Sequence, residues 1–374
     1  MKILVSSTDS MMIQFLIPHV KKLIADGHQV DIACSIVKGR MEEIKKTLPE
    51  SVNIFTVNLA RSPIKPSNLK GLKELKKIIA DGNYNFVWTN EPVMGVMTRL
   101  AARKHRKNGL KVMYMAHGFH FFKGAPKLNW LIFYTIEKFM ARYTDILVTI
   151  NQMDYELAKE KFTKIKNIYK VHGTGVDFSR LDIEVDRESV RAELGLADQD
   201  YLIMSVGELN ENKNQKVIIE AINLLNDKSV KYFMAGIGDQ EPILQEKVEK
   251  YGLTEQVKFL GYTKEVGKYL HAANAFAFPS YREGLGLASL EAMHVGLPIL
   301  TSNRHGINDY SINKETGFKY HPDDAKGFAE GIKTLKADKE LSEKISLNNK
   351  EVSKNYEIKN SIEEISKIIR TVAK

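Results

Sequence analysis

The chain has 374 residues, 43% of them hydrophobic, and a formal net charge of +9. This length predicts two domains rather than one, and the hydrophobic content is sufficient for two buried cores. The single cysteine, Cys34, excludes a disulfide framework and favours a reducing compartment. We expect no signal peptide, because the first residues, MKILVSSTDSMMIQFL, contain no long apolar h-region, and no membrane span, because no apolar run of about 20 residues is present.

The charge is distributed unevenly along the chain. Residues 1–180 contain 29 basic and 15 acidic residues, which gives +14, whereas the remainder contains 26 and 31, which gives −5. This asymmetry favours two domains with different partners. A basic surface of this kind suits nucleic acid, anionic lipid head groups or a diphosphate substrate, and a plain solvated surface is the alternative.

The first 35 residues predict a strand, a helix and a second strand. The strand covers Lys2–Ser6, the helix Met11–Asp26 and the next strand Val30–Ser35. This is a βαβ unit, the usual beginning of a doubly wound sheet. The loop that starts at Ser7 lacks the G-x-G-x-x-G pattern of dinucleotide sites, so we expect this half to hold an acceptor.

The alternation of strands and helices continues to about residue 161. Strands are predicted at Val52–Val57, Phe86–Thr89, Val112–Ala116 and Ile146–Ile150, with helices at Lys65–Ala80, Pro92–Lys104 and Asp154–Lys161. His117 and Gly118 follow the third of these strands, at the edge where open α/β sheets bind ligands. His120 lies three residues further on, but no cysteine or acidic pair accompanies it, so a metal site is not expected.

A second series of strands and helices follows an interdomain region at about residues 172–200. Strands are predicted at Tyr201–Val206, Tyr232–Ala235, Val257–Leu260, Ala275–Phe278 and Ile299–Ser302, and helices at Gln215–Leu225, Leu287–His294, 324–336, 339–349 and Lys359–Ala373. The repetition of the pattern predicts a second domain similar to the first.

The most informative stretch is Phe278–Pro298, FPSYREGLGLASLEAMHVGLP. It predicts a strand end, a tight glycine turn and a helix that begins near Leu287. Backbone N–H groups around Gly286, together with the helix dipole, favour an anion at this point. Glu283 and Glu291 are placed to contact two parts of one extended ligand. A ligand that has a phosphate between two hydroxyl-bearing groups is a nucleotide-sugar, and we expect such a ligand here. The alternative is an ordinary βα unit in which the two glutamates are solvated and bind nothing.

Three further loops follow strands of the second half. Lys213 lies in a strand-to-helix loop that begins at Gly207, where its ammonium group can neutralise a diphosphate. Gly236 and Gly238 follow the next strand, but Glu241 stands where an NAD fingerprint needs a third glycine or alanine. Tyr262 follows the strand after that, where we expect contacts to a nucleotide base.

In this order, the motifs resemble those of the retaining glycosyltransferases of family 4. The resemblance is carried by the spacing of Glu283 and Glu291, the G-V-D segment at 175–177, the G-x-L-x-x-x-K pattern at 207–213 and HGFHFFKGAP at 117–126. The last segment resembles enzymes that assemble bacterial capsular polysaccharides and exopolysaccharides on a lipid carrier. The family pattern has arginine where this chain has Glu208, so either another cation compensates or the diphosphate is held differently.

The resemblance implies an α/β fold with two Rossmann-like doubly wound domains facing across a cleft, the GT-B fold. Residues 1–175 would form the acceptor-binding domain, and a C-terminal helix at about 358–374 would pack back on it. Residues 176–357 would form the domain that binds the nucleotide-sugar.

The resemblance also implies the reaction and the residues that perform it. A hexosyl or N-acetylhexosaminyl group would pass from a nucleotide-diphosphate sugar, expected to be a UDP-sugar, to an acceptor with retention of configuration. The catalytic residues would be Glu283, His117 and Lys213. Donor-binding residues would be Gly207, Lys213, Gly236, Gly238, Tyr262, Gly286, Leu287 and Glu291, and acceptor-side residues Ser7, His117 and Gly118. No metal or cofactor is expected, since no Asp-x-Asp motif occupies a suitable loop.

The expected partners are a lipid-linked saccharide acceptor and the membrane surface, but not nucleic acid. The location implied is cytoplasmic, peripheral to the inner face of the cytoplasmic membrane. Basic residues in Lys65–Lys77 and Arg99–Lys107, with aromatic residues near Phe121 and Phe122, are the candidates for membrane association. Two alternatives stay open: a nucleotide-sugar epimerase of the same fold, and a non-catalytic basic protein that tethers to membrane or nucleic acid.

Overall fold

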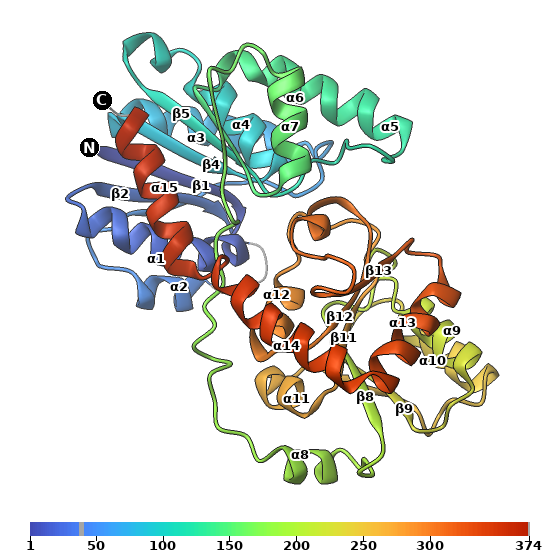
Figure 1. Cartoon of the computed structure of the whole chain (residues 1–374). Helices are drawn as coiled ribbons and strands as arrows, with labels where there is room; N and C mark the ends of the chain where they lie inside the picture. The colour runs from blue at the N-terminus through green and yellow to red at the C-terminus, as the bar shows by residue number, and fades with distance from the viewer. Residues whose placement is uncertain (37–40, 373–374) are drawn as a thin grey trace. The chain divides into compact units, whose positions relative to one another are not determined.

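The computed structural model describes residues 1–36 and 41–372, without the side chain of residue 372. The chain forms two compact units, Met1–Gly175 with Ile358–Lys374 and Val176–Glu357. Each unit is a parallel sheet packed with helices (Figure 1). The predicted fold class of two doubly wound α/β domains is confirmed.

The sheet of the first unit has seven parallel strands in the order β3-β2-β1-β4-β5-β6-β7. The strands are β1 (Lys2–Asp9), β2 (Gln29–Ser35), β3 (Ile54–Thr56), β4 (Phe86–Asn90), β5 (Lys111–Ala116), β6 (Ile146–Thr149) and β7 (Asn167–Lys170). The strand order reverses at β1, so the carboxyl ends of β1 and β4 flank the switch point at which such sheets bind ligands.

The helices of the first unit connect these strands. They are α1 (Ser10–Ala25), α2 (Met41–Thr47), α3 (Ser67–Gly82), α4 (Pro92–Ala102), η1 (His105–Asn108), α5 (Lys127–Asn129), the π-helical turn η2 (Trp130–Tyr134), α6 (Thr135–Met140), η3 (Ala141–Tyr143) and α7 (Gln152–Lys161). The side chain of Asp9 caps α1 by accepting a hydrogen bond from the backbone N–H of Met12 at 3.2 Å. Helix α3 begins after Pro66 and not at Lys65 as predicted, because Lys65 precedes a proline and such a residue disfavours the helical conformation.

The C-terminal helix α15 (Ile358–Val372) belongs to the first unit (Figure 1). Ser361 donates a hydrogen bond to the carbonyl of Gly173 at 2.6 Å and lies 3.2 Å from Nε2 of the buried His19 in α1. His172 contacts Glu364 through Nδ1 at 2.9 Å and through its backbone N–H at 3.1 Å. The last residue of the predicted helix, Ala373, lies outside the described residues.

The sheet of the second unit has six parallel strands in the order β10-β9-β8-β11-β12-β13. The strands are β8 (Tyr201–Val206), β9 (Val230–Ala235), β10 (Val257–Gly261), β11 (Ala275–Phe278), β12 (Ile299–Ser302) and β13 (Gly317–Tyr320). Here the order reverses at β8, so the loops that follow β8 and β11 meet at the switch point.

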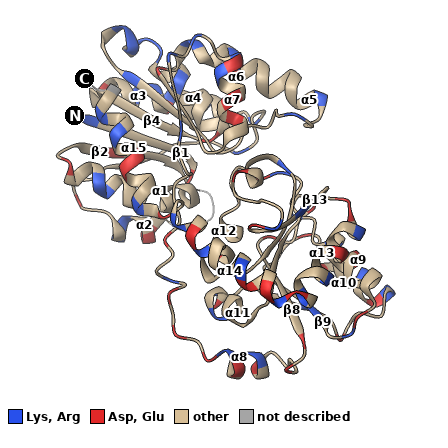
Figure 2. Ribbon diagram, in the orientation of Figure 1, with Lys and Arg blue, Asp and Glu red and all other residues tan. Residues whose placement is uncertain are grey.

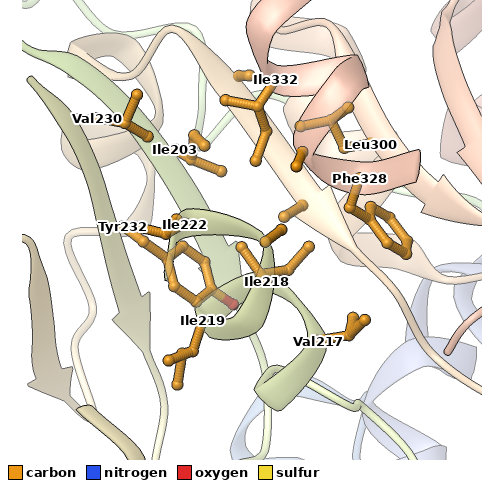
Figure 3. Close-up of a cluster of buried hydrophobic side chains, with 14 of the residues drawn as sticks. Ile203, Val217, Ile218, Ile219, Ile222, Val230, Tyr232, Leu300, Phe328 and Ile332 are labelled. Carbon is orange, nitrogen blue, oxygen red and sulfur yellow. The ribbon is translucent and has the colours of Figure 1, made fainter. Parts of the chain in front are cut away.

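Eight helical segments complete the described part of the second unit. They are α8 (Arg187–Glu193), α9 (Lys216–Leu225), α10 (Glu241–Lys250), α11 (Val266–Ala272), α12 (Leu287–Val295), η4 (His305–Asp309), α13 (Ala325–Ala337) and α14 (Lys339–Lys354). Ile218 and Ile222 of α9 pack with Ile203 of β8, Leu300 of β12 and Phe328 of α13 in one buried cluster (Figure 3). This core fixes the strands whose loops carry the candidate donor site.

Sequence patterns missed two of the four outer strands, β7 and β13. β7 and β13 lie at sheet edges, and half or more of the residues in each are only partly buried, so neither forms a continuous apolar run. The predicted strand Val52–Val57 is shorter than expected, because only Ile54–Thr56 pairs with β2. None of the helices in the described residues combines the length and apolarity needed to cross a membrane.

Candidate functional site

Lys213 and Glu283 form an ion pair at the switch point of the second unit. The Lys213 Nζ lies 2.7 Å from the Glu283 Oε1, and both side chains are largely buried. Lys213 comes from the loop after β8 and Glu283 from the loop after β11, two strands that are hydrogen-bonded neighbours. Two residues 70 positions apart, both predicted as catalytic, are therefore in direct contact.

Backbone contacts join the loops that carry this pair. The Tyr281 N–H donates to the carbonyl of Asn212 at 2.8 Å, and the Asn212 side chain donates to the carbonyl of Arg282 at 2.9 Å. The Lys213 ammonium also lies 4.6 Å from the centre of the Phe278 ring, within the range of a cation–π interaction. The lysine is thus held between a carboxylate and an aromatic face, with little freedom to sample other positions.

The glycines of the adjacent loops permit close backbone approach. A Cβ on Gly236 would lie 1.8 Å from the carbonyl oxygen of Gly207, and one on Gly238 would lie 2.1 Å from that of Leu209. Gly207 itself has φ +142°, and the Lys213 side chain passes over it. Only glycine fits these positions, so Gly236 and Gly238 bring two loops together in addition to any contact with a ligand.

Helix α12 begins at the glycine turn, as the sequence predicts. Gly286 has φ +88° and a Cβ there would lie 2.8 Å from the Tyr310 hydroxyl. Leu287 is the first helical residue, so the unpaired N–H groups of the first turn point away from the helix at this end. Buried Ser289 and Tyr310 lie beside this turn. Tyr310 was missed because it belongs to a different loop, and Ser289 was not singled out although it lies within the quoted stretch.

Glu291 contacts a cation that sequence reasoning also missed. Its Oε1 pairs with Nη2 of Arg180, a largely exposed side chain. Burial raises the pKa of Glu291, and the charge of Arg180 opposes this shift. The segment of Arg180 is fixed to α12 by the Phe178 ring, which stacks on His294 at 4.2 Å, and by Asp182, which lies 2.7 Å from the His294 Nε2.

The remaining donor-side positions are exposed. The side chain of Tyr262 is 66% exposed at the end of β10. Glu208, at the position of the family arginine, is exposed and accepts a hydrogen bond from Asn210 at 3.1 Å. Lys213 and Arg180 are instead the cations that lie against the two glutamates, so Arg180 is a candidate for the compensating charge.

In the first unit, His117 lies at the carboxyl end of β5. Its Nε2 is 2.9 Å from Oδ1 of Asn90, the last residue of the neighbouring strand β4. Burial lowers the pKa of His117 to about 4, so the ring is neutral near pH 7. A proton on Nε2 satisfies Asn90 and leaves Nδ1 as a hydrogen-bond acceptor. Gly118 follows with φ +111° and turns the chain away from the strand.

Ser7 contacts a residue that was not predicted. Its hydroxyl donates to Glu91 Oε2 at 2.6 Å, and the Thr8 N–H donates to the same oxygen at 2.8 Å. Glu91 has φ +65°, a costly conformation for a non-glycine residue, and burial raises its pKa. The sequence feature that could have identified Glu91 is its position directly after the end of β4 and directly before Pro92.

Two expectations about the basic and aromatic surface were wrong. Phe121 and Phe122 are buried, and Phe121 packs among other aromatic rings. Arg99 is also buried, where its guanidinium group pairs with Glu137 at 2.8 Å.

The ring of His120 stacks on Phe133 at 4.6 Å. Across residues 1–36 and 41–372, no group of three or more His, Cys, Asp or Glu side chains is arranged to hold a metal ion.

Two family models match the chain, one in each half. Residues 2–151 match the model described as glycosyl transferase 4-like, and residues 186–352 match glycosyl transferases group 1. The second match includes Lys213, Glu283 and Glu291, and the first includes Ser7 and His117.

Curated relatives match over most of the chain. The putative glycosyltransferase EpsD of Bacillus subtilis is 35% identical over 95% of this chain and 92% of its own length. The UDP-Gal:alpha-D-GlcNAc-diphosphoundecaprenol alpha-1,3-galactosyltransferase of Escherichia coli is 28% identical over 79% of this chain and 78% of its own.

The fold is also similar to that of solved glycosyltransferases. Anabaena HepE, crystallised with UDP and glucose, superposes with a TM-score of 0.79 at 18% identity, covering 99% of this chain and 100% of HepE. WaaG, a glycosyltransferase involved in lipopolysaccharide biosynthesis, superposes with a TM-score of 0.75 at 18% identity over 98% and 99%. With family models in both halves and a relative that matches almost end to end, the chain belongs to the family 4 glycosyltransferases and has the GT-B fold.

Proposed function

We propose that this glycosyltransferase transfers a sugar from a UDP-sugar to a lipid-linked saccharide, with retention of configuration, in the synthesis of a bacterial surface polysaccharide. The observation that carries the proposal is the contact of Lys213 with Glu283 beside the start of α12, with Glu291 further along that helix. A cation, a helix N-terminus and two carboxylates fit a diphosphate that lies between two hydroxyl-bearing groups.

In the proposed mechanism, the second unit stabilises the leaving group. Negative charge develops on the β-phosphate as the bond to the sugar breaks. The Lys213 ammonium and the N–H groups at Gly286 and Leu287 stabilise that charge. Glu283 binds sugar hydroxyl groups after the phosphate replaces it as the partner of Lys213. Glu291 accepts hydrogen bonds from the ribose, which requires Arg180 to move from its carboxylate.

The first unit supplies the acceptor side of the proposal. The neutral ring of His117 accepts a hydrogen bond from the acceptor hydroxyl through Nδ1, and Asn90 fixes the ring. Glu91 lies at the neighbouring strand end, where its carboxylate is held by Ser7 and Thr8. We add Glu91 to the acceptor residues because its strained backbone is maintained at a ligand-binding edge of the sheet.

The names of the relatives support the substrate class. The E. coli relative is named for a UDP-sugar donor and a diphosphoundecaprenol-linked acceptor. Other relatives are named for capsular polysaccharide biosynthesis in Staphylococcus aureus and for amylovoran biosynthesis in Erwinia amylovora. HepE is described in complexes with UDP and with UDP-glucose.

A donor panel tests the proposal. The protein is incubated with UDP-hexoses and UDP-N-acetylhexosamines and a lipid extract that contains diphosphate-linked saccharides. UDP release is followed together with the mass of the lipid product. We expect one donor to give UDP and a heavier lipid-linked saccharide, with and without EDTA. An epimerised nucleotide-sugar formed without acceptor would favour the epimerase, and no turnover with any donor would contradict the assignment.

A further inference from the structure

The continuous helix formed by α5, η2 and α6 carries an exposed apolar ridge. Large apolar side chains that are 37–70% exposed recur along it every one to four residues, at Leu128, Leu131, Ile132, Ile136 and Phe139. Positions three and four apart lie on one face of a helix, so these side chains form one surface rather than scattered contacts. In Figure 2 this helix is largely tan between its blue α5 end and the charges near α6.

A basic hollow adjoins the α6 end of the ridge. It has a volume of about 290 Å³ and is lined by Thr135, Lys138, Phe139, Ala141, Arg142, Lys161, Phe162, Thr163 and Lys164. Four of these residues are cations and none is acidic. The hollow therefore combines positive charge with the exposed ring of Phe139.

Among the described residues, three of the four cations that line the hollow have no carboxylate partner. The Lys138 ammonium lies 5.5 Å from the Tyr134 ring, and the Arg142 guanidinium lies 4.2 Å from the Phe139 ring. Within the described part of the chain, Lys138, Arg142 and Lys164 are in no ion pair, whereas Lys161 pairs with Glu160 at 2.6 Å. At the opposite end of the ridge, Lys123 and Lys127 are exposed.

We infer that this ridge and hollow dock on the surface of a membrane that contains anionic phospholipid. The apolar side chains enter the boundary between head groups and acyl chains, and Lys138, Arg142 and Lys164 bind lipid phosphates. The inference rests on the proposed lipid-linked acceptor and adds the surface that meets the lipid. It replaces the residues expected from the sequence to approach the membrane: Phe121, Phe122 and Arg99 are buried, and the lysines of α3 belong neither to the ridge nor to the lining of the hollow.

Charge and position both favour a membrane over a protein partner. An apolar ridge with cations at both ends and a basic hollow matches an anionic interface. The same helix also holds the loop that follows His117. The Asn129 side chain donates to the carbonyl of His120 at 2.9 Å, and the Trp130 indole donates to that of Phe122 at 3.2 Å. Docking through this helix therefore places the acceptor-side loop next to the lipid that carries the acceptor.

Co-sedimentation with vesicles tests the inference on the full-length protein. The vesicles contain phosphatidylcholine alone or phosphatidylcholine with phosphatidylglycerol, at about 0.15 M and about 1 M salt, where the Debye length falls from about 8 Å to about 3 Å. We expect binding to the anionic vesicles at low salt and much weaker binding to neutral vesicles or at high salt. Wild-type protein that binds neither vesicle, or both equally, would overturn the inference.

Two pairs of matched variants locate the surface. The triple variant Lys138→Gln/Arg142→Gln/Lys164→Gln removes three cations of the hollow, and Lys70→Gln/Lys73→Gln/Lys76→Gln removes three exposed lysines of α3. Leu131→Ser is matched by Leu69→Ser in α3, because the two leucines are 70% and 67% exposed. Each basic residue at an anionic leaflet contributes about five-fold, so the first triple variant should bind about 100-fold more weakly. Leu131→Ser should reduce binding about 10-fold.

The α3 variants should bind within about two-fold of wild type, because their side chains lie off the docking surface. Equal losses in the two triple variants would overturn the inference in favour of a diffuse charge effect. The inference would also be overturned if the wild type formed a dimer, did not bind vesicles, and lost the dimer in Leu131→Ser. The ridge would then dock on a second copy of the chain. UDP binding by calorimetry, retained in every variant, separates these outcomes from misfolding and from failure of the proposed function.

Discussion

The Lys213 Nζ lies 2.7 Å from Glu283 Oε1, so the residue proposed to bind phosphate and the residue proposed to bind sugar neutralise each other's charge. Lys213 has a second neighbour in the Phe278 ring at 4.6 Å. A diphosphate donor must therefore compete with Glu283 for the ammonium group. Because of this competition, a substitution of Glu283 should change the affinity for UDP differently from the turnover of the UDP-sugar.

Glu283→Gln should leave UDP affinity equal to or higher than that of wild type, because Lys213 loses its competing carboxylate. Turnover with the UDP-sugar should fall on the order of 10-fold to 100-fold, since a charged hydrogen bond to the sugar is worth about 1.5–3 kcal/mol. Calorimetry with UDP and steady-state kinetics measure the two quantities. A Glu283→Gln variant that loses UDP affinity but turns over normally would refute the assigned roles.

The pH dependence of UDP binding should depend on Glu291. Burial raises the pKa of this carboxyl, so it takes up a proton at a higher pH than an ordinary glutamate as the solution is acidified. Protonation removes the acceptor for the ribose, so UDP affinity should fall as the pH decreases through that raised pKa. The part of the acid decrease that comes from Glu291 should disappear in Glu291→Gln, whereas the part that comes from protonation of the UDP phosphate should remain.

Arg180→Gln provides the complementary change. Arg180 lowers the pKa of Glu291, so its removal should move the acid decrease to higher pH. Lys326→Gln, an exposed lysine in α13, is the charge-matched control and should leave the profile unchanged. Superimposable pH profiles for wild type and Arg180→Gln would show that the two side chains are not coupled in solution.

His117 should act as a neutral group. Its pKa is lowered to about 4 by burial, so the ring becomes charged only well below the range of the assay. Between about pH 5 and pH 8, kcat/KM for the acceptor should contain no step from this histidine. His117→Ala should lower kcat/KM for the acceptor about 2-fold to 10-fold, the value of an uncharged hydrogen bond, and leave UDP affinity unchanged. A step near pH 6.5 that this substitution removes would contradict the account.

Arg99 should contribute to stability rather than to binding. Its guanidinium group pairs with Glu137 at 2.8 Å, donates to the carbonyl of Gly95 at 2.8 Å and lies 4.0 Å from the Tyr114 ring. Arg99→Ala leaves a buried carboxylate without its partner, so the free energy of unfolding should fall by about 3–5 kcal/mol. Arg103→Ala, at an exposed position, should change it by less than about 0.5 kcal/mol in the same denaturant titration.

The parts of the fold that the sequence predicts well are those with continuous apolar runs or glycine turns. The inner strands β1, β4, β5, β8 and β11 have fully or almost fully buried patterns, which makes them recognisable. The edge strands β7 (Asn167–Lys170) and β13 (Gly317–Tyr320) were missed because each is short and partly buried and combines apolar with polar or glycine residues, whereas the edge strand β10 was found from the apolar residues of Val257–Leu260. The start of α12 was predicted because Gly286 and Leu287 mark a turn and a helix in adjacent residues.

The candidate site was predicted residue by residue, but its contacts were not. Lys213 and Glu283 were singled out separately, and nothing in a linear pattern indicates that they pair across 70 positions. Arg180 was missed because its importance comes only from its contact with Glu291. Arg99 was misplaced on the surface for the related reason that its partner, Glu137, is 38 residues away. Charge counts describe composition, whereas burial depends on the tertiary fold.

Calorimetry with UDP, on purified wild type and Lys213→Ala, shows whether Lys213 holds the diphosphate of the donor. Wild type should bind UDP saturably, and the variant should bind it on the order of 10-fold to more than 100-fold more weakly, because a charge-assisted contact to the diphosphate is removed. Thermal unfolding of both proteins checks that the variant is folded. Absence of UDP binding to wild type, or equal affinity in the two folded proteins, would contradict the claim that Lys213 holds the diphosphate of a nucleotide-sugar.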